Sequence, residues 1–300
     1  MLEIQHVNKS YGDRAVLKDV SFTVGHGRMT GFVGGNGAGK TTTMRIILGV
    51  LDPDAGSVSL DGTLLTAADR RRFGYMPEER GLYPKMKVQE QLVYLARLHG
   101  FTSAAANRNA AALLEQLGLG ERTNDTVESL SLGNQQRAQI AAALVHEPEV
   151  LVLDEPFSGL DPMAVDVVLG VLQSHAASGA PVLFSSHQLD IVERLCDDLV
   201  IIADGEIRAN GSVEGLRREH GSSRHELLLG DSRAAGAGDA GWVRDVPGVT
   251  VIDFDGGYAL FEAGDDARAA VLARAVASGE LVSFGPHEPS LAQVFREVIR

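Results

Sequence analysis

Hydrophobic and polar residues alternate along the first part of the chain. The alternation covers residues 2–33 and is interrupted by turn residues at Gly12-Asp13 and Gly25-His26-Gly27. A period of two is typical of strands with one buried face, so the pattern predicts a small antiparallel sheet. Its last segment, Thr30-Gly31-Phe32-Val33, predicts a buried strand.

Continuous apolar runs later in the chain predict further buried strands. Val150–Leu153 ends in two acids, and Val182–Phe184 leads through two serines to a histidine. Strands buried on both faces are typical of parallel sheets covered by helices. A shorter strand is expected to end at Pro77, and residues 199–209 form a hairpin around Asp204-Gly205-Glu206. The pattern therefore indicates an α/β fold.

Helical periodicity fills the region between these strands. Residues 87–145 predict three helices, each with apolar positions on one face. We expect Ser103 to cap the second helix, and the third to begin near Asn134 and end before Pro148. The pattern predicts a helical subdomain at about 85–145, inserted between two parts of the sheet.

The composition shifts near residues 217–241, where Ala234–Gly241 is typical of a loop or linker. The segments that follow predict a hairpin, a helix, a strand and a final helix at 249–262, 265–278, 281–285 and 289–299. We therefore predict two domains, at residues 1–220 and 221–300, of which the second is a small α+β domain without a chemical motif.

A glycine-rich loop follows the strand at 30–33 and precedes a helix. Its sequence is Gly34-Gly35-Asn36-Gly37-Ala38-Gly39-Lys40-Thr41-Thr42, which has the spacing of a P-loop. Backbone N–H groups and a helix N-terminus attract phosphate oxygens. Lys40 adds a positive charge for the β- and γ-phosphates, and Thr41 adds a hydroxyl for Mg²⁺. The alternative is a flexible glycine turn with an incidental lysine.

Asp154 and Glu155 lie at the end of a buried strand. Two carboxylates are costly there unless they hold a cation or transfer protons. With a P-loop upstream, Asp154 is the expected Mg²⁺-associated acid, and Glu155 the expected base that activates a water molecule. A simple helix cap before Pro156 is the alternative.

Several single residues are weaker candidates. Tyr11 precedes a turn and can stack on a flat base, or it is a half-exposed sheet residue. Glu78 and His187 follow strands at the edge where α/β active sites collect, although a solvated glutamate and a structural histidine explain them equally simply. Ser131 and Gly133 precede a helix, which makes an anion site or an ordinary capped N-terminus.

Composition restricts the class of protein. The 300 residues carry a net charge of −13, which argues against a nucleic-acid partner. The single cysteine, Cys196, excludes an intrachain disulfide and fits a reducing compartment. The N-terminus lacks the basic and apolar segments of a secretory signal. The longest uncharged stretch, Val167–Leu189, contains turn residues, so we expect no membrane span.

Together these segments resemble the nucleotide-binding subunit of an ATP-binding-cassette (ABC) transporter, over about residues 2–220. The matching motifs are Walker A at Gly34–Thr41, the signature at Leu130–Gln135, Walker B at Val150–Glu155, the D-loop at Ser158–Asp161, the switch histidine His187 and the base-stacking aromatic Tyr11. Tyr75-x-Pro77, Gly81–Pro84 and Pro289–Phe295 resemble the ABC-2 subgroup of drug, sodium and antibiotic exporters, including its C-terminal accessory domain.

The resemblance implies a RecA-like P-loop NTPase core with an antiparallel β subdomain and an inserted helical subdomain. It implies ATP and Mg²⁺ as cofactors, with Glu155, His187 and Lys40 as catalytic residues and Thr41, Asp154 and Glu78 at the metal. The implied nucleotide-binding residues are Tyr11, Gly34, Asn36, Gly37, Ala38, Gly39, Lys40, Thr41, Thr42, Ser131, Gly133 and Asn134.

The implied partners are a second copy of the chain, arranged head to tail, and a separate membrane permease. The resemblance therefore implies a location at the cytoplasmic face of the cell membrane. The sequence departs from the family pattern in two regions. Glu78 stands where a glutamine is usual, and the signature has Leu132 and Asn134 where glycine and glutamine are common. A carboxylate near Mg²⁺ differs electrostatically from an amide.

The main alternative is a soluble ATPase of the same superfamily that acts on nucleic acid or ribosomes. Repair and chromosome-maintenance ATPases of this superfamily usually have long coiled coils, and this sequence shows no sustained heptads. Ribosome-associated members usually have two cassettes, and this sequence has one. A nucleotide sensor without activity is a third hypothesis, against which the presence of Glu155 argues.

Overall fold

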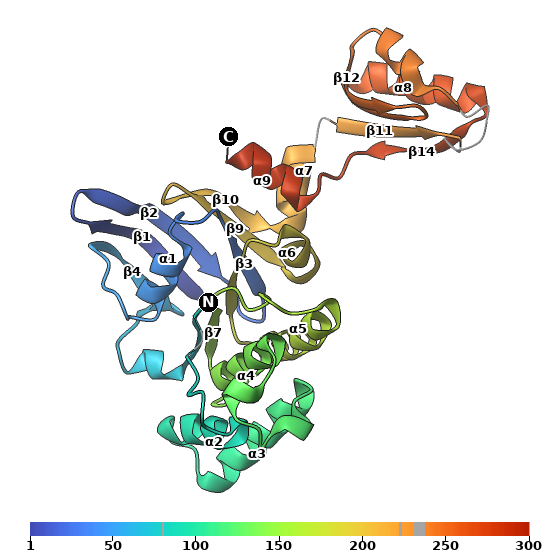
Figure 1. Cartoon of the computed structure of the whole chain (residues 1–300). Coiled ribbons are helices and arrows are strands. Elements are labelled where there is room, and N and C mark those ends of the chain that lie inside the picture. The colour runs from blue at the N-terminus through green and yellow to red at the C-terminus, as the bar shows by residue number, and fades with distance from the viewer. Residues whose placement is uncertain (80, 222–223, 231–237, 300) are drawn as a thin grey trace. The chain divides into compact units, whose positions relative to one another are not determined.

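The computed structural model describes residues 1–79, 81–221, 224–230 and 238–299 (Figure 1). The chain forms two compact units. The first is Met1–Val213 with the last residues of the chain from Val298, and the second is Glu214–Glu297. This division lies somewhat before the expected boundary at residues 220 and 221.

An antiparallel sheet begins the first unit, as the alternation predicts. Its strand order is β2-β1-β4-β5. The strands are β1 (Leu2–Tyr11), β2 (Arg14–Val24), β4 (Ala55–Leu60) and β5 (Thr63–Leu64). A two-residue turn at Gly12-Asp13 joins β1 to β2 and places Tyr11 directly opposite Arg14.

A six-stranded sheet of order β10-β9-β3-β8-β7-β6 forms the centre of this unit. Its strands are β3 (Met29–Val33), β6 (Phe73–Met76), β7 (Val150–Leu153), β8 (Val182–Ser186), β9 (Asp198–Ala203) and β10 (Glu206–Ser212). All neighbouring pairs are parallel except β9 and β10. Every residue of β3, β7 and β8 is buried, which explains their continuous apolar runs.

Helices cover this sheet and form the predicted insert (Figure 1). The sheet carries α1 (Lys40–Ile47), α5 (Pro162–Ala177) and α6 (Leu189–Leu195), and the insert contains α2 (Val88–Leu98), α3 (Ser103–Gln116) and α4 (Leu132–Leu144). Short 3₁₀ helices lie at Asp69–Arg72, Gly120–Arg122 and Val127–Ser129.

Two expected helix starts are wrong by one or two residues. Thr102, not Ser103, is the N-cap of α3, and its hydroxyl accepts a hydrogen bond from Ala105 N at 3.3 Å. Both side chains can cap a helix, so only the extended backbone of Thr102 decides between them. Helix α4 begins at Leu132 rather than near Asn134, because Ser131 caps it.

The core of the first unit lies between the two sheets and α1. Phe22 from β2 and Phe32 from β3 pack with ring centroids 5.2 Å apart. Met44 and Ile47 from α1 are fully buried in the same cluster. Burial of each such side chain stabilises the fold by roughly 1.5–3 kcal/mol, so this core fixes α1 against β3.

The second unit is a four-stranded antiparallel sheet of order β12-β13-β11-β14 with helices. Its elements are α7 (Val213–Gly221), β11 (Arg224–Leu229), the 3₁₀ helix Ala240–Asp245, β12 (Val249–Asp255), β13 (Tyr258–Ala263), α8 (Asp265–Ser278), β14 (Leu281–Pro286) and α9 (Leu291–Val298). The predicted hairpin, helix, strand and final helix are confirmed.

Strand β11 was not predicted, although it pairs with both β13 and β14. Its buried residues His225, Leu227 and Leu229 alternate with half-buried ones, but the sequence has three polar residues followed by three leucines, so hydropathy alone shows no period of two. The first half of the linker expected at Ala234–Gly241 lies outside the described residues, and its last two residues begin a 3₁₀ helix.

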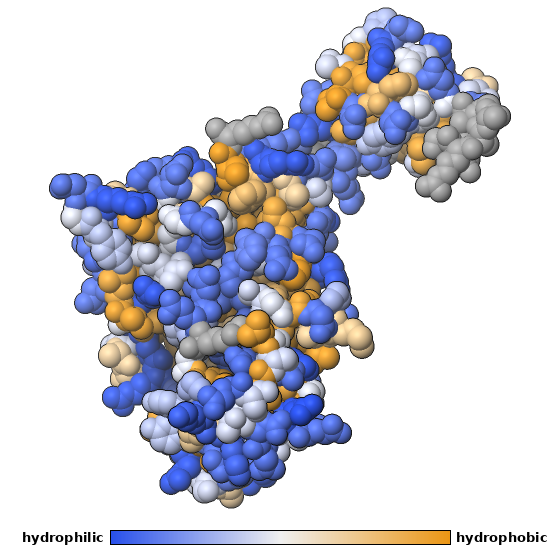
Figure 2. All heavy atoms as spheres, viewed as in Figure 1, coloured by the Kyte–Doolittle hydropathy of each residue, from blue (hydrophilic) through white to orange (hydrophobic). Residues whose placement is uncertain are grey.

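Polar residues cover most of the visible face of each unit, and hydrophobic residues occur there in small groups (Figure 2). Within the described ranges, no helix is both long enough and apolar enough to cross a lipid bilayer.

Gly74 in β6 allows α4 to pack closely on the sheet. A Cβ atom there would lie 2.3 Å from Ala143 O and 2.8 Å from Leu151 Cδ1. Gly74→Ala is therefore expected to lower the free energy of unfolding by about 1–3 kcal/mol, measured by urea denaturation. The control is Gly170→Ala on the exposed side of α5, where a Cβ meets nothing within 4 Å and a gain of up to about 1 kcal/mol is expected. Equal stability of the two variants would contradict this packing.

Candidate functional site

The glycine-rich loop leaves β3 and enters α1 in a conformation that requires glycine at several positions. Gly37 and Gly39 have positive φ angles of 77° and 113°. A Cβ on Gly34 would lie 2.4 Å from Ile202 O, and one on Gly39 would lie 2.5 Å from Leu17 Cδ2. The loop is thus shaped by local backbone constraints together with close packing against β2 and β9.

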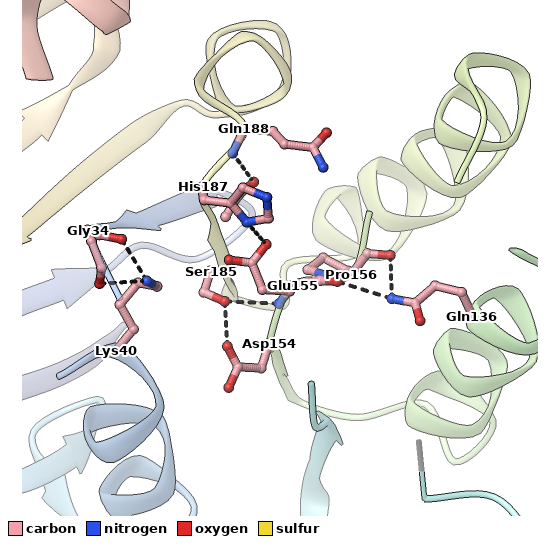
Figure 3. Close-up of polar contacts among 11 residues, drawn as sticks. Gly34, Lys40, Gln136, Asp154, Glu155, Pro156, Ser185, His187 and Gln188 are labelled. Carbon is pink, nitrogen blue, oxygen red and sulfur yellow. Dashed lines mark hydrogen bonds and ion pairs between the residues drawn. The ribbon is translucent and has the colours of Figure 1, made fainter. Parts of the chain in front are cut away.

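Lys40, the first residue of α1, points back into this loop. Its Nζ donates hydrogen bonds to Gly34 O at 2.6 Å and to Gly35 O at 3.2 Å (Figure 3). Thr43 Oγ1 donates to Gly39 O at 2.9 Å and fixes the start of the helix. The ammonium group is therefore held at the loop, at the N-terminus of α1, where phosphate oxygens are attracted.

Asp154 joins three elements of the site. Its carboxylate is 1% exposed. It accepts a hydrogen bond from Thr41 Oγ1 at 2.9 Å. It accepts a second one from Ser185 Oγ at 2.5 Å, which Figure 3 shows. Ser185 Oγ in turn accepts the backbone N–H of Glu155 at 2.9 Å. Thr41 and Asp154 therefore present a hydroxyl and a carboxylate side by side, which are hard oxygen donors suited to Mg²⁺.

Glu155 and His187 meet where β7 and β8 end. His187 Nδ1 lies 2.9 Å from Glu155 Oε2, and the two side chains are 62% and 12% exposed (Figure 3). Glu155 has a left-handed backbone, with φ at 52°. The structure thus places these two predicted residues in direct contact, on the same sheet edge as the loop.

A cleft of about 450 Å³ collects most of the predicted residues. It is lined by Tyr11, Arg14, Val16, Gly35, Asn36, Gly37, Gly39, Lys40, Thr41, Thr42, Glu78, Asp154 and Glu155. Tyr11 is 51% exposed. Gly34 and Ala38 belong to the loop but are buried and do not line the cleft.

The signature residues lie at the N-terminus of α4 and do not line the cleft of their own chain. Ser131 Oγ accepts the Asn134 N–H at 3.4 Å. The Asn134 side chain accepts a hydrogen bond from Arg137. A Cβ on Gly133 would lie 3.5 Å from Gly159 O. Gly133 therefore lies beside the predicted D-loop, whereas the Asn134 side chain is engaged by its own helix.

Several residues of this site have no recognisable motif in the sequence. Arg14 lines the cleft, and the two-residue turn after Tyr11 was the signal that these two residues pair. Ser185 was visible only as a polar residue near the end of an apolar strand. Gln136 donates to the Glu155 and Pro156 carbonyls at 3.1 and 3.0 Å, a contact that no local pattern indicates.

Tyr75 in β6 lies near the acid pair. Burial raises the pKa of its phenol above the ordinary value, and the Asp154 carboxylate raises it further. Burial likewise raises the pKa of the Cys196 thiol, whose Sγ packs against Gly31. Tyr75 therefore stays neutral, and the cysteine is a packed thiol rather than a nucleophile.

Comparison with known proteins agrees with this geometry. Residues 17–158 match the ABC transporter family, and residues 211–299 match the C-terminal domain of DrrA1-3-like ATP-binding proteins. The ABC transporter ATP-binding protein YhaQ of Bacillus subtilis is 38% identical, over 100% of this chain and 98% of its own length. The linearmycin resistance ATP-binding protein LnrL of the same organism is 36% identical, over 72% of this chain and 70% of its own.

A solved structure of the ATP-binding subunit of an ABC transporter is also similar. It has 36% sequence identity and a TM-score of 0.68, and the match covers 74% of this chain and 93% of that one. The fold of the cassette is therefore shared.

A P-loop beside an acid pair, at the carboxyl ends of parallel strands, defines a nucleotide-hydrolysing P-loop protein. The chain belongs to the ATP-binding subunits of ABC transporters, with a DrrA-like C-terminal domain. It is an ATPase, and these relatives do not favour the nucleic-acid alternative.

Ser185 offers a test of the network around the acid pair. Ser185→Ala removes both the donor to Asp154 and the acceptor for the Glu155 N–H. We expect the free energy of unfolding to fall by about 1–3 kcal/mol and steady-state ATP turnover to fall about tenfold, while the dissociation constant of ATP changes little. Ser186→Ala, in the next buried position, removes only an acceptor for Gln188 N and serves as the control. Unchanged turnover in Ser185→Ala would contradict the bridging role.

Proposed function

We propose that the chain hydrolyses Mg²⁺-bound ATP in this cleft and thereby powers export through a separate membrane permease. The observation that carries the proposal is the hydrogen-bonded series from Thr41 through Asp154 and Ser185 to Glu155, which continues to His187. Two relatives are named for linearmycin resistance and Nod factor export, which supports export as the direction.

The donor set around Asp154 fits Mg²⁺. Within the described ranges, no cluster of three or more His, Cys, Asp or Glu side chains is arranged to hold a metal ion. Mg²⁺ is commonly bound through one or two carboxylates, with phosphate oxygens and water completing its shell. Thr41 and Asp154 would hold the ion, with Glu78 at the edge of the same cleft. When bound, Mg²⁺ neutralises charge on the phosphate oxygens.

Side chains and backbone groups of the protein bind the nucleotide and accept the proton from water. Lys40 and the N–H groups of the loop bind the β- and γ-phosphates, and Tyr11 stacks on the base. Asn36, Thr42 and three of the loop glycines, Gly35, Gly37 and Gly39, line the phosphate path. Glu155 accepts a proton from the attacking water, because its carboxylate lies at the cleft and His187 orients it at 2.9 Å.

The signature residues serve the ATP of a second copy in this proposal. Ser131, Gly133 and Asn134 lie away from their own cleft, at the N-terminus of α4, where an anion is favoured. Two copies arranged head to tail would bring each signature opposite the partner's loop. The permease would then receive the movement at the cytoplasmic face of the membrane. We retain residues 1–220 as the cassette and 221–300 as an accessory domain.

Glu155→Gln tests the assignment of the base. The amide keeps the size of the side chain but cannot accept the proton, so ATP binding should persist while turnover falls about 10²- to 10⁴-fold. Steady-state phosphate release and equilibrium nucleotide binding are the measurements. Size-exclusion chromatography in ATP is expected to show accumulated dimers. Near-normal phosphate release would refute the role of Glu155.

A mixed dimer tests whether the site is shared between copies. Lys40→Ala and Ser131→Arg are each expected to be inactive alone. After mixing, one site carries both defects and the other carries none, so part of the ATPase activity should return if one intact site turns over.

The matched control mixes Lys40→Ala with Glu155→Gln. Both residues line the cleft of one chain, so every site of this mixture keeps one defect and no activity should return. If Ser131 served its own chain, the first mixture would behave like this control.

A further inference from the structure

Helix α4 carries two buried glutamines on one face, three residues apart. Gln136 and Gln139 are 5% and 4% exposed. A buried amide is costly unless its polar atoms are hydrogen-bonded. In this helix both amides reach outside α4, and both donate to backbone carbonyls of loops that leave the central sheet.

Gln136 holds the loop after β7. Its Nε2 donates to Glu155 O at 3.1 Å and to Pro156 O at 3.0 Å (Figure 3). Gln139 does the same for the loop after β6, where its Nε2 donates to Pro77 O at 2.8 Å and to Glu79 O at 3.1 Å. Gln139 therefore holds the backbone on either side of Glu78, and Gln136 holds the backbone at Glu155.

The backbone at Glu155 needs such support. Its φ of 52° lies in the left-handed region, which a residue with a side chain seldom adopts without help from its surroundings. The Glu155 N–H is held by Ser185 Oγ at 2.9 Å, and its carbonyl also accepts the Ser158 N–H at 3.2 Å. Gln136 is the side-chain donor that reaches the Glu155 carbonyl from helix α4. The direction of the Glu155 carboxylate depends on this backbone.

We propose that Gln136 is a positioning residue for ATP hydrolysis. By donating to the Glu155 and Pro156 carbonyls, it fixes the left-handed turn that aims the Glu155 carboxylate into the cleft. The inference rests on the proposed role of Glu155 as the base. It also gives α4, whose N-cap is Ser131, a direct connection to that base. Gln136 does not line the cleft, so its effect should fall on turnover rather than on nucleotide affinity.

The principal variant is Gln136→Met, which keeps the unbranched shape of the side chain but removes the amide. In the purified full-length chain we expect kcat for ATP to fall about 10- to 100-fold, because small displacements of a reacting group have effects of this size. The dissociation constant of ATP, measured by titration calorimetry, should change less than about twofold.

Gln91→Met is the matched control. Gln91 in α2 is 2% exposed, and its Oε1 accepts the Tyr83 N–H at 2.6 Å. The same chemical change there removes a buried hydrogen bond to backbone but touches neither Glu155 nor Pro156. Its kcat should stay within about twofold of the wild-type value. An equal loss of kcat in both variants would indicate general destabilisation and overturn the proposal.

Glu155→Gln separates failure of this inference from failure of the proposed function. If Glu155→Gln loses turnover and Gln136→Met does not, the positioning role is refuted while the base remains. If Glu155→Gln retains turnover, the role of Glu155 fails, and with it the inference. In single-turnover measurements, Gln136→Met added to Glu155→Gln should cause little further loss, since both changes act through one carboxylate. If Gln136→Met lowers single-turnover hydrolysis in the Glu155→Gln background as much as it does in the wild-type background, the proposal is contradicted.

If Gln136→Met does not fold, Gln136→Glu replaces it. This variant keeps the length of the side chain but turns an acceptor toward two carbonyl oxygens, and the same loss of kcat is expected. Normal turnover in folded Gln136→Glu would overturn the proposal.

Discussion

The buried carboxylate of Asp154 is the constraint on which the rest of the site depends. A charge with 1% exposure is tolerated only where hydrogen bonds replace the lost water. Thr41 supplies one bond from α1, and Ser185 supplies the other from β8. Because these donors come from segments far apart in sequence, the carboxylate brings the phosphate loop, the acid pair and the β8 end into one arrangement.

The central sheet makes that arrangement possible. Strands β3, β8 and β7 are adjacent and parallel, so their carboxyl ends meet at one edge. Lys40, Glu155 and His187 all follow these ends. The core around Phe32 fixes α1 against the sheet, and α4 packs against β6 and the following loops. Packing far from the cleft therefore determines distances within it.

Much of this arrangement was predictable from the sequence because it follows from local rules. Most strands and helices, the glycine loop and the acid pair are each indicated by a pattern confined to a few residues, and their order along the chain follows from these patterns. Strand β11 was missed because its sequence, three polar residues followed by three leucines, shows no alternation, and the alternating burial of His225, Leu227 and Leu229 arises only in the fold. The start of α3 was misplaced because Thr102 and Ser103 have similar capping chemistry.

Contacts between distant segments were beyond sequence reasoning. The bonds from Ser185 to the acid pair join residues 30 and 31 positions apart, and those from Gln136 span 19 and 20. A glutamine within a helix has the same local pattern whether it faces solvent or a catalytic loop. Its role appears only when the fold brings the loop after β7 against α4. Positioning residues are for this reason harder to identify than the groups they position.

The hairpin between β1 and β2 has a consequence for the choice of nucleotide. Tyr11 and Arg14 stand opposite each other at the mouth of the cleft, and Tyr11 is half exposed. A ring that stacks on a base contacts its face, which purines share, rather than the edge that distinguishes adenine from guanine. Among the described residues lining the cleft, Tyr11 is the sole aromatic one. With Tyr11 in its proposed role, the stacking contact alone would not distinguish ATP from GTP, and discrimination would have to come from groups that reach the edge of the base.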